Sequence, residues 1–248
     1  MTDYALRREM VEIGRAMYEK ELVAASDGNL SVRLGPNEFL ITPTGSCLGL
    51  LKASELVVID SEGRPAGSAG RPTSEFRLHL EVYRRRPDVS SVVHAHPPLC
   101  TAFSVAGASL EECVLPEVAF TLGAIPTTDY ATPTTDEPPR VIRDYIGQCD
   151  AMILDRHGTL TVGGSLREAF FKLDKLEHTA RVVLAARILG KVRVLTGPQV
   201  EKLMEARKSL GLQGKQIRCV HCTSGAGPAA GDDLVAKISG EVLRVLGK

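Results

Sequence analysis

The sequence predicts an α/β fold in which helices cover a mixed β-sheet. Apolar residues recur at helical spacing in segments such as residues 3–20, which is typical of an amphipathic helix. Short apolar runs between turn residues, such as residues 30–34 and 38–42, are typical of strands. The two kinds of segment interleave too irregularly for a regular βαβ array, which favours a mixed sheet with helices packed on it. The 248 residues can bury a substantial core in one domain or two small ones.

The individual elements follow from local signals along the chain. Ser74 is expected to cap a helix that stops at Pro87, and residues 165–168 match the capping box of the longest helix. Pro198 is expected to open a further helix. The expected helices span residues 3–20, 74–86, 136–147, 165–189, a segment from 198, and 232–246. The expected strands span residues 30–34, 38–42, 55–60, 89–96, 119–123 and 124–130, with two more in 151–163 around a His-Gly turn. Residues 223–232 are expected to form a loop or linker.

Composition argues against several classes of protein. The chain carries 30 Lys and Arg against 30 Asp and Glu, so its net charge is zero; this argues against a nucleic-acid partner or an anionic membrane surface. The N-terminus has no apolar core of the signal-peptide type, and no run reaches the roughly 18 apolar residues of a membrane helix. The six cysteines are scattered, so a reduced, cytoplasmic setting is expected. The segment RCVHC (218–222) contains a Cys-x-x-Cys pair, which can bind metal, form a redox pair or have no function.

The segment SVVHAHPP, residues 91–98, places His94 and His96 two residues apart behind an apolar run. Residues i and i+2 of a strand point to the same face of the sheet, so both rings can reach one metal ion. A catalytic zinc site uses about three protein ligands and keeps one position open. The alternative interpretation is a pair of hydrogen-bonded histidines at the end of a strand.

Further candidates for the same site come from elsewhere in the chain. His157 precedes Gly158 at the expected strand–turn–strand junction, where glycine permits a backbone that brings the imidazole inward; alone, such a turn also has a purely structural interpretation. Glu75 lies at a helix start, where a carboxylate benefits from the helix dipole, and charge capping is its alternative role. His79 lies on the same helix face as Glu75 and is interpreted as a partner of the ligands or a plain helix residue. His178 is interpreted as structural.

Three pairs of small or polar residues precede the metal candidates. They are Gly28-Asn29, Thr44-Gly45 and Thr73-Ser74. Each pair offers backbone N–H groups together with a hydroxyl or amide, and the last lies at an expected helix start. Such oriented dipoles can hold a phosphate without Lys or Arg. Each pair alone is an ordinary turn, so the phosphate-site hypothesis depends on their coexistence.

Several motifs occur in one order along the chain. They are GNLSVR (28–33), FLITPTG (39–45), PTSEFRLH (72–79), RPDVSSVVHAHPP (86–98) and HGTLTVGGSLREAF (157–170). Together they resemble the class II aldolase/adducin family, and most of all its L-fuculose-1-phosphate aldolase-like branch, over about residues 5–190. The resemblance implies a family domain over residues 1–222, with residues 223–248 as a linker and a C-terminal helix packed on or beside it.

The resemblance also implies a set of site residues. Zinc would be held by His94, His96 and His157, with Mn²⁺, Fe²⁺ or Co²⁺ as alternatives. Glu75 corresponds to the family's acid/base, which is also a zinc ligand in the unliganded enzyme. The phosphate site of a small-molecule sugar phosphate corresponds to Asn29, Thr44, Gly45, Thr73 and Ser74, with Gly28 shaping the loop.

Fold, assembly and reaction are implied in the same way. The family fold is a three-layer α/β/α arrangement with a mixed, mostly antiparallel sheet and helices on both faces. The family assembly is a ring-like homotetramer with active sites at subunit interfaces. The implied reaction cleaves a ketose 1-phosphate, L-fuculose 1-phosphate or a related deoxyketose phosphate, to dihydroxyacetone phosphate and an aldehyde. It passes through a zinc-stabilised enediolate, and Glu75 moves the proton.

The chain also departs from the family pattern. The family's aldolases use a tyrosine from a neighbouring subunit to protonate the aldehyde oxygen, but residues 113–123 read CVLPEVAFTLG and no tyrosine follows Tyr145. Glu117 falls in the right segment to substitute. The family's 4-epimerases usually carry Asp where this chain has Glu75, which argues for cleavage over epimerisation. Decarboxylase and dehydratase activities remain open, as does a non-catalytic adducin-like role, although such members lose the ligands that this chain keeps.

Overall fold

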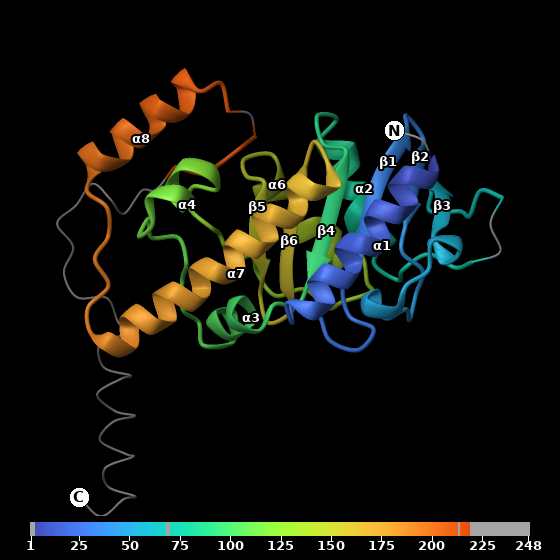
Figure 1. The fold of residues 1–248 in the computed structure, drawn as a ribbon, viewed down its shortest axis with the longest axis horizontal. Helices are drawn as coiled ribbons and strands as arrows, with labels where there is room; N and C mark the ends of the chain where they lie inside the picture. Colours follow the sequence, from blue (N-terminus) through green and yellow to red (C-terminus); the bar gives the residue numbers. More distant parts are fainter. Residues whose placement is uncertain (1–2, 68–69, 213, 219–248) are drawn as a thin grey trace, which may run out of the picture.

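The computed structural model describes residues 3–67, 70–212 and 214–218, and it contains a six-stranded sheet with helices on both faces (Figure 1). The strands are β1 (Asn29–Gly35), β2 (Glu38–Ile41), β3 (Val57–Asp60), β4 (Ser91–Ala95), β5 (Ala151–Leu154) and β6 (Gly158–Gly163). Their order is β3-β2-β1-β4-β6-β5, and all of these pairings are antiparallel. A parallel bridge between Thr127 and Ile153 adds a mixed edge. The predicted mixed, mostly antiparallel sheet in an α/β/α arrangement is confirmed.

The helices fall into two layers and a peripheral group. They are α1 (Asp3–Glu19), α2 (Phe76–Arg85), α3 (Pro98–Val105), α4 (Pro116–Thr121), α5 (Glu137–Val141), α6 (Arg143–Ile146), α7 (Leu166–Leu189) and α8 (Gly197–Ser209), with two 3₁₀ turns, Leu48–Leu50 and Ala53–Glu55. In Figure 1, α1 and α7 lie in front of the sheet and α2 lies behind it. Helices α4 and α8 lie beyond the β5 edge.

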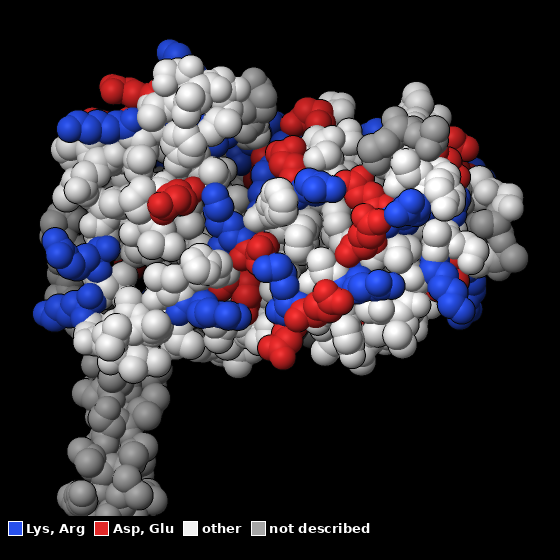
Figure 2. Space-filling view, viewed as in Figure 1, with Lys and Arg blue, Asp and Glu red and all other residues white. Residues whose placement is uncertain are grey.

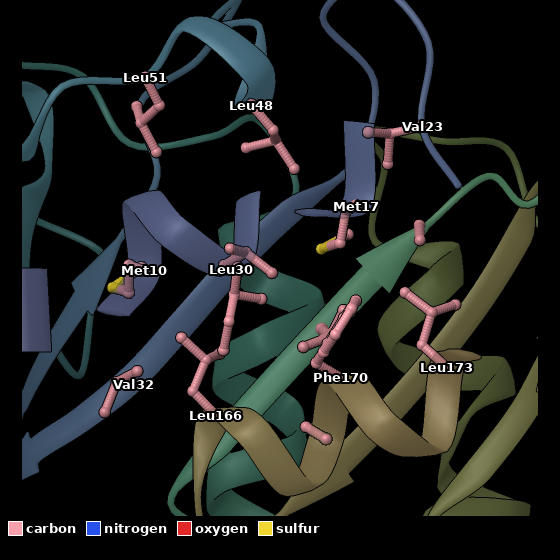
Figure 3. Packing of buried hydrophobic residues seen from close by; sticks show 14 of the residues in the cluster. Met10, Met17, Val23, Leu30, Val32, Leu48, Leu51, Leu166, Phe170 and Leu173 are labelled. Carbon is pink, nitrogen blue, oxygen red and sulfur yellow. The ribbon is translucent and has the colours of Figure 1, made fainter. Parts of the chain in front are cut away.

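One face of the sheet packs against α1 and α7. Met10 and Met17 of α1 and Phe170 of α7 lie in one cluster with Leu30 of β1 (Figure 3). Val93 of β4 belongs to the same cluster. All five side chains are buried. The helical spacing predicted for residues 3–20 therefore reflects a real buried stripe on α1.

The opposite face packs against α2 and α6. Val82 of α2 and Ile146 of α6 lie in a second cluster with Val92 of β4 and Leu160 of β6. Because side chains alternate along a strand, every second residue of β1 and β4 must face α2. In β1 these positions include Ser31, which is polar and buried, so the α2 face combines apolar packing with a polar strip.

Three local predictions need correction. Residues 119–123, expected as a strand, lie largely in α4, whose Pro116 occupies the first turn and whose Val118 and Ala119 are buried. The helix expected at 136–147 is divided at Ile142 into α5 and α6. Helix α3, opened by Pro98, was not predicted, because Pro97-Pro98 obscures the start of a short helix.

Other expectations are met in part. Residues 124–130 do run along β5, but through isolated bridges rather than a regular strand. The helix after residue 74 begins at Phe76, and the N-cap residue is Glu75, without a side-chain capping bond, so Ser74 does not cap it. The capping bond from Glu168 N–H to the Ser165 hydroxyl is present, as expected.

The last described residues return to the body of the protein. The N–H of Ala124 donates to the carbonyl of Ile217 over 2.9 Å, and α8 packs on α4. Cys47, Cys100 and Cys149 are free thiols, whereas Cys113 is disulfide-bonded, unlike the reduced state expected. The expected linker, last helix and Cys-x-x-Cys pair lie wholly or largely outside the described residues, as does the predicted domain boundary.

The surface and the helices carry two further features. On the face shown in Figure 2, cationic and anionic side chains are interspersed rather than segregated. Within the described part of the chain, none of the helices combines the length and apolar character that a membrane crossing would need.

A buried arginine joins the ends of three elements. Arg86, 1% exposed, follows α2 and donates to Asp150 Oδ1 over 2.7 Å, to the carbonyl of Ile146 over 3.0 Å and to Asp88. Lys172 of α7 donates to the second Asp150 oxygen over 2.8 Å. The network therefore connects α2, α6, β5 and α7 through charged groups that are largely removed from water.

Arg86→Ala is expected to lower the free energy of unfolding by about 3 kcal/mol or more, because it leaves a buried carboxylate with one partner fewer. The control is Arg8→Ala, whose pairing with Glu12 is solvent-exposed and contributes less than about 1 kcal/mol. Urea denaturation of both variants at pH 7 measures the difference. Equal losses in the two variants would show that the buried network adds nothing beyond a surface ion pair.

Candidate metal centre

Four potential ligands gather at one end of the sheet. Glu75, His94, His96 and His157 each offer one ligand atom, and these atoms all lie within 4.8 Å of one another. The three imidazole rings are separated by 4.7 to 4.9 Å between centroids. The structure therefore brings together every residue that the sequence suggested as a metal ligand.

Strand pairing and two turns place these side chains. His94 lies in β4, opposite Asn29 of β1 and Leu160 of β6, while His96 follows directly after β4 ends. Glu75 occupies the N-cap position of α2. His157 lies in the turn between β5 and β6. The cluster is thus assembled from segments that are distant in the chain.

Glycine is required where the His157 turn approaches β4. A Cβ at Gly158 would collide with the carbonyl oxygen of Ala95 and lie 2.8 Å from Cδ2 of His96. Real Cβ atoms do not tolerate such contacts with backbone. The His-Gly pair in the sequence therefore reflects close packing of this turn against the end of β4.

The ring of His94 is oriented by the strand beside it. Its Nδ1–H donates to the carbonyl of Thr159 over 2.9 Å, which leaves Nε2 free to face the cluster. Histidine ligands are typically held in this way, since the second nitrogen fixes the tautomer. Nδ1 of His96 lies 3.5 Å from an Asp27 carboxylate oxygen. Neither Asp27 nor Thr159 was predicted from the sequence as part of the site. Thr159 contributes only its backbone carbonyl, which no residue pattern reveals.

The spacing of the donor atoms fits a single ion. Two ligands that each lie about 2.0–2.2 Å from one tetrahedral zinc ion lie roughly 3.3–3.6 Å from each other. Nε2 of His94 is 3.0 Å from Nε2 of His96 and 3.2 Å from Glu75 Oε2. Nε2 of His157 is 3.4 Å from Glu75 Oε1. The donor set of three imidazole nitrogens and one carboxylate thus suits a divalent cation without large rearrangement.

The charged groups of the cluster shift the pKa values of its members in different directions. Burial raises the pKa of Glu75, but His94 and the Asn29 amide outweigh this effect and hold that pKa well below its usual range. Burial lowers the pKa of His94, yet the adjacent Glu75 carboxylate outweighs it and raises the pKa above its ordinary value. Burial and the charge of His94 lower the pKa of His96 and of His157 to about 4. Neutral imidazoles and an ionised carboxylate are the forms that bind metal.

The centre remains open on one side. The side chain of His94 is fully buried, but Glu75, His157 and His96 keep exposed fractions of 11%, 10% and 24%. Glu75 Oε1 is buried and makes no hydrogen bond within the described residues. The cluster is therefore partly accessible from solvent, while Glu75 Oε1 is held inside it without a hydrogen-bond donor from the described part of the chain.

The three small-polar segments lie next to one another beside this centre. The N–H of Leu30 donates to Thr42 Oγ1, and the N–H of Thr73 donates to the carbonyl of Thr42 over 3.0 Å. The N–H of Thr44 donates to the carbonyl of Arg71 over 3.1 Å. Backbone pairing therefore joins the segments that contain Gly28-Asn29, Thr44-Gly45 and Thr73-Ser74.

The individual members of these segments differ in exposure. Asn29 and Thr73 are buried, whereas Thr44, Gly45 and Ser74 are exposed. Gly28 has a φ of 75°, and a Cβ there would lie 2.6 Å from Val23 and 3.0 Å from the His94 carbonyl oxygen. Gly28 therefore lets the loop pack directly against β4. The Asn29 side chain points to Glu75, to which its Nδ2–H donates over 2.8 Å.

Two other candidates lie apart from the cluster. Glu117 is exposed on α4 and is not among the grouped ligands. His178 is exposed on α7. His79, in contrast, is fully buried and contacts Asn29, which agrees with its interpretation as a partner of the ligands.

Known proteins share this fold and sequence. Residues 8–184 match the family described as the class II aldolase and adducin N-terminal domain. The chain is 38% identical over 177 residues to the L-fuculose phosphate aldolase of Methanococcus vannielii, covering 71% of this chain and 93% of that protein. It is 33% identical to the 3-oxo-tetronate 4-phosphate decarboxylase of Haemophilus influenzae, covering 82% of this chain and 98% of that protein.

A solved structure gives the same result. YgbL of Klebsiella pneumoniae, described as an aldolase, epimerase or decarboxylase, superposes with a TM-score of 0.76 at 34% identity and covers 82% of this chain and 99% of that one. The family match includes all four clustered residues, and the relatives named here are lyases by their reaction class. The chain belongs to the class II aldolase and adducin family.

Proposed function

We propose that the protein is a metal-dependent lyase that acts on a sugar phosphate. The observation that carries this proposal is the group of Glu75, His94, His96 and His157, with all four ligand atoms within 4.8 Å of one another. A divalent ion held there would supply Lewis-acid stabilisation of negative charge on substrate oxygens. The donor set favours Zn²⁺, and Mn²⁺, Fe²⁺ and Co²⁺ accept similar donors.

The proposed reaction is cleavage of a ketose 1-phosphate to dihydroxyacetone phosphate and an aldehyde. The Methanococcus vannielii relative, an L-fuculose phosphate aldolase, supports L-fuculose 1-phosphate or a related deoxyketose phosphate as the substrate. Breaking the C3–C4 bond leaves its electron pair on C3 as an enediolate. Glu75 takes up a proton from solvent and delivers it to C3, which converts the enediolate to dihydroxyacetone phosphate and returns Glu75 to the carboxylate. Its Oε1 makes no hydrogen bond to the described residues and lies 3.4 Å from His157 Nε2, inside the cluster.

Decarboxylation is the second candidate, and it is favoured by the missing tyrosine. A 3-oxo-tetronate 4-phosphate that loses its carboxyl carbon as CO₂ leaves the electron pair on C2, which gives the same three-carbon enediolate phosphate. In the aldolase reaction the C4 hydroxyl of the substrate must lose its proton before the aldehyde can depart. CO₂ departs from a carboxylate and requires no group to remove a proton. Residues 113–123 contain no tyrosine that could exchange this proton with the C4 oxygen. The Haemophilus influenzae relative is a decarboxylase of this type.

The proposed phosphate site consists of Gly28, Asn29, Thr44, Gly45, Thr73 and Ser74. Its support is the backbone pairing that joins the three segments and their position beside the start of α2, where oriented N–H groups favour an anion. The open space around the Gly45 backbone, where an added Cβ would meet nothing within 4 Å, leaves room for a ligand.

A homotetramer with active sites at its interfaces completes the proposal. Glu117 is exposed on α4, away from the cluster of its own chain, so any part in the reaction would be at the active site of a neighbouring subunit. At that site the Glu117 carboxylate would accept the proton of the hydroxyl that becomes the aldehyde oxygen.

The purified full chain is expected to bind about one divalent ion. His94→Ala and His157→Ala should each lose it after dialysis, because each variant removes one nitrogen donor. Elemental analysis by mass spectrometry measures the occupancy. His178→Ala, an exposed histidine outside the cluster, is the control and should keep its metal. Full occupancy in either cluster variant would exclude that residue as a ligand.

The leaving group can be identified with two substrates and one product assay. Release of dihydroxyacetone phosphate from L-fuculose 1-phosphate is expected if the protein is an aldolase, and release from 3-oxo-tetronate 4-phosphate if it is a decarboxylase. A chelator should abolish either activity, and added Zn²⁺ should restore it. Activity that survives complete metal removal would contradict the proposal.

Glu75→Gln is expected to reduce kcat by at least about 10²-fold, because it removes proton transfer at a constant side-chain shape. Metal should be retained, since three histidines suffice as ligands. Exchange of the hydroxymethyl proton of dihydroxyacetone phosphate with deuterated solvent should fall in parallel, as it requires neither aldehyde nor CO₂. Glu19→Gln, on the exposed side of α1, is the control. Exchange at the wild-type rate in the Glu75 variant would place the base elsewhere.

A further inference from the structure

A chain of hydrogen bonds runs from Glu75 into the interior of the protein. The Asn29 amide meets Glu75 Oε2 over 2.8 Å, and Asn29 Oδ1 meets His79 Nε2 over 2.5 Å. His79 Nδ1 lies 2.6 Å from the Ser31 hydroxyl, which in turn lies 2.8 Å from the Tyr83 hydroxyl. Five consecutive polar side chains are therefore linked without a break.

The sequence places these groups on two facing elements. Glu75, His79 and Tyr83 are spaced by four residues and so follow one face at the start and along the length of α2. Asn29 and Ser31 are spaced by two and so point to the same face of β1. The helical and strand periods coincide here, and the two rows of polar groups interdigitate between α2 and the sheet.

The four groups behind Glu75 are removed from water. His79 and Ser31 are fully buried, and Asn29 and Tyr83 are each 4% exposed. Buried polar groups need partners, and a network in which every member is satisfied holds a unique arrangement. Each of these side chains is partnered by the next, so no member can turn without leaving another unsatisfied.

The chemistry of the two ends gives the chain a direction. The ionised carboxylate of Glu75 only accepts, so Asn29 must present its Nδ2–H to it and its Oδ1 to His79. His79 must therefore donate from Nε2. Burial lowers the pKa of His79 to about 3, so the ring is neutral and its Nδ1 accepts from the Ser31 hydroxyl. Ser31 in turn accepts from Tyr83. Every O–H and N–H in the chain points toward Glu75.

We infer that His79 is a positioning residue for Glu75: by donating from Nε2 to Asn29 Oδ1, it locks the Asn29 carboxamide in the orientation that holds the carboxylate. The inference rests on the proposed acid/base role of Glu75. Without the Nε2 donor, Asn29 Oδ1 is left buried without its partner, and only the contact with Glu75 still holds the amide in this orientation. A rotated carboxamide would set an oxygen against a carboxylate oxygen and leave Glu75 free to move.

The amide side chains Gln and Asn separate this role from simple packing at residue 79. A Gln side chain reaches the position of Nε2 and can donate there, whereas an Asn side chain reaches only the position of Nδ1 and can serve Ser31 but not Asn29. Both variants keep a polar group in the buried space. A purely structural role would make the two variants similar, whereas the positioning role makes them differ.

In the metal-loaded enzyme, His79→Asn is expected to lower kcat by about 10- to 100-fold, the size expected when a hydrogen bond to a charged group is lost. KM should stay within about threefold, because the other residues of the proposed phosphate site and the three clustered histidines are unchanged. His79→Gln should keep kcat within about threefold of the wild type, because the donor is retained. Thr179→Val, which removes a buried hydroxyl bonded to the Lys175 carbonyl within α7, is the control for general destabilisation and should leave kcat unchanged.

A measurement without substrate tests the network separately from the function. Nitrogen NMR of the metal-free wild-type protein at pH 7 should show His79 as the neutral tautomer with the proton on Nε2, assigned by loss of its signals in His79→Gln. A proton on Nδ1, or on both nitrogens, would overturn the inference even if catalysis behaves as proposed. Equal loss of kcat in the Gln and Asn variants, or no loss in either, would overturn it as well. If neither sugar phosphate is turned over, the proposed function fails, and the tautomer alone still decides whether the network has this direction.

Discussion

The antiparallel register of β1, β4 and β6 is the constraint on which the site depends. It places Asn29 opposite His94 on one side of β4 and Leu160 opposite His94 on the other. A slip of one residue would turn His94 toward α1 and α7 and bring an apolar neighbour to the cluster instead. Burial of both faces of β4 resists such a slip, because Val93 belongs to one core and Val92 to the other. The packing of both faces of β4 thus fixes the register of the strand and with it the position of His94.

The charges of the four clustered residues are balanced by one another and by the neighbouring Asn29 amide. The Glu75 carboxylate favours one positive charge beside it and raises the pKa of His94, whereas burial and that charge lower the pKa values of His96 and His157. The Asn29 amide compensates part of the Glu75 charge from the opposite side. In the two proposed reactions this arrangement would serve aldehyde or CO₂ as the departing group, because both place their electron pair on the same three-carbon fragment.

The parts of the fold and site that follow local rules could be predicted from the sequence. The His-x-His pair depends only on strand alternation, and α1 and α7 carry long periodic stripes or a capping box. Residues 119–123 were wrongly assigned to a strand, because a six-residue helix is too short to show a period. Ser31 and Tyr83 were missed for another reason. Each is ordinary in its own strand or helix, and their partnership exists only after α2 has packed on β1.

The distribution of the four clustered residues along the chain bears on how the proposed metal would be acquired during synthesis. His94 and His96 lie close together in sequence and would form a partial chelate even in a nascent chain, whereas His157 joins only when β6 pairs with β4. That pairing closes a long loop and is intrinsically slow. Ions that bind the unfolded chain weaken the stabilisation that binding gives to the native state. An ion captured early on this pair would keep its place, because Glu75 and His157 would complete its coordination as the sheet closes. On the proposed metal site, metal capture and folding would then reach the same loaded protein in either order.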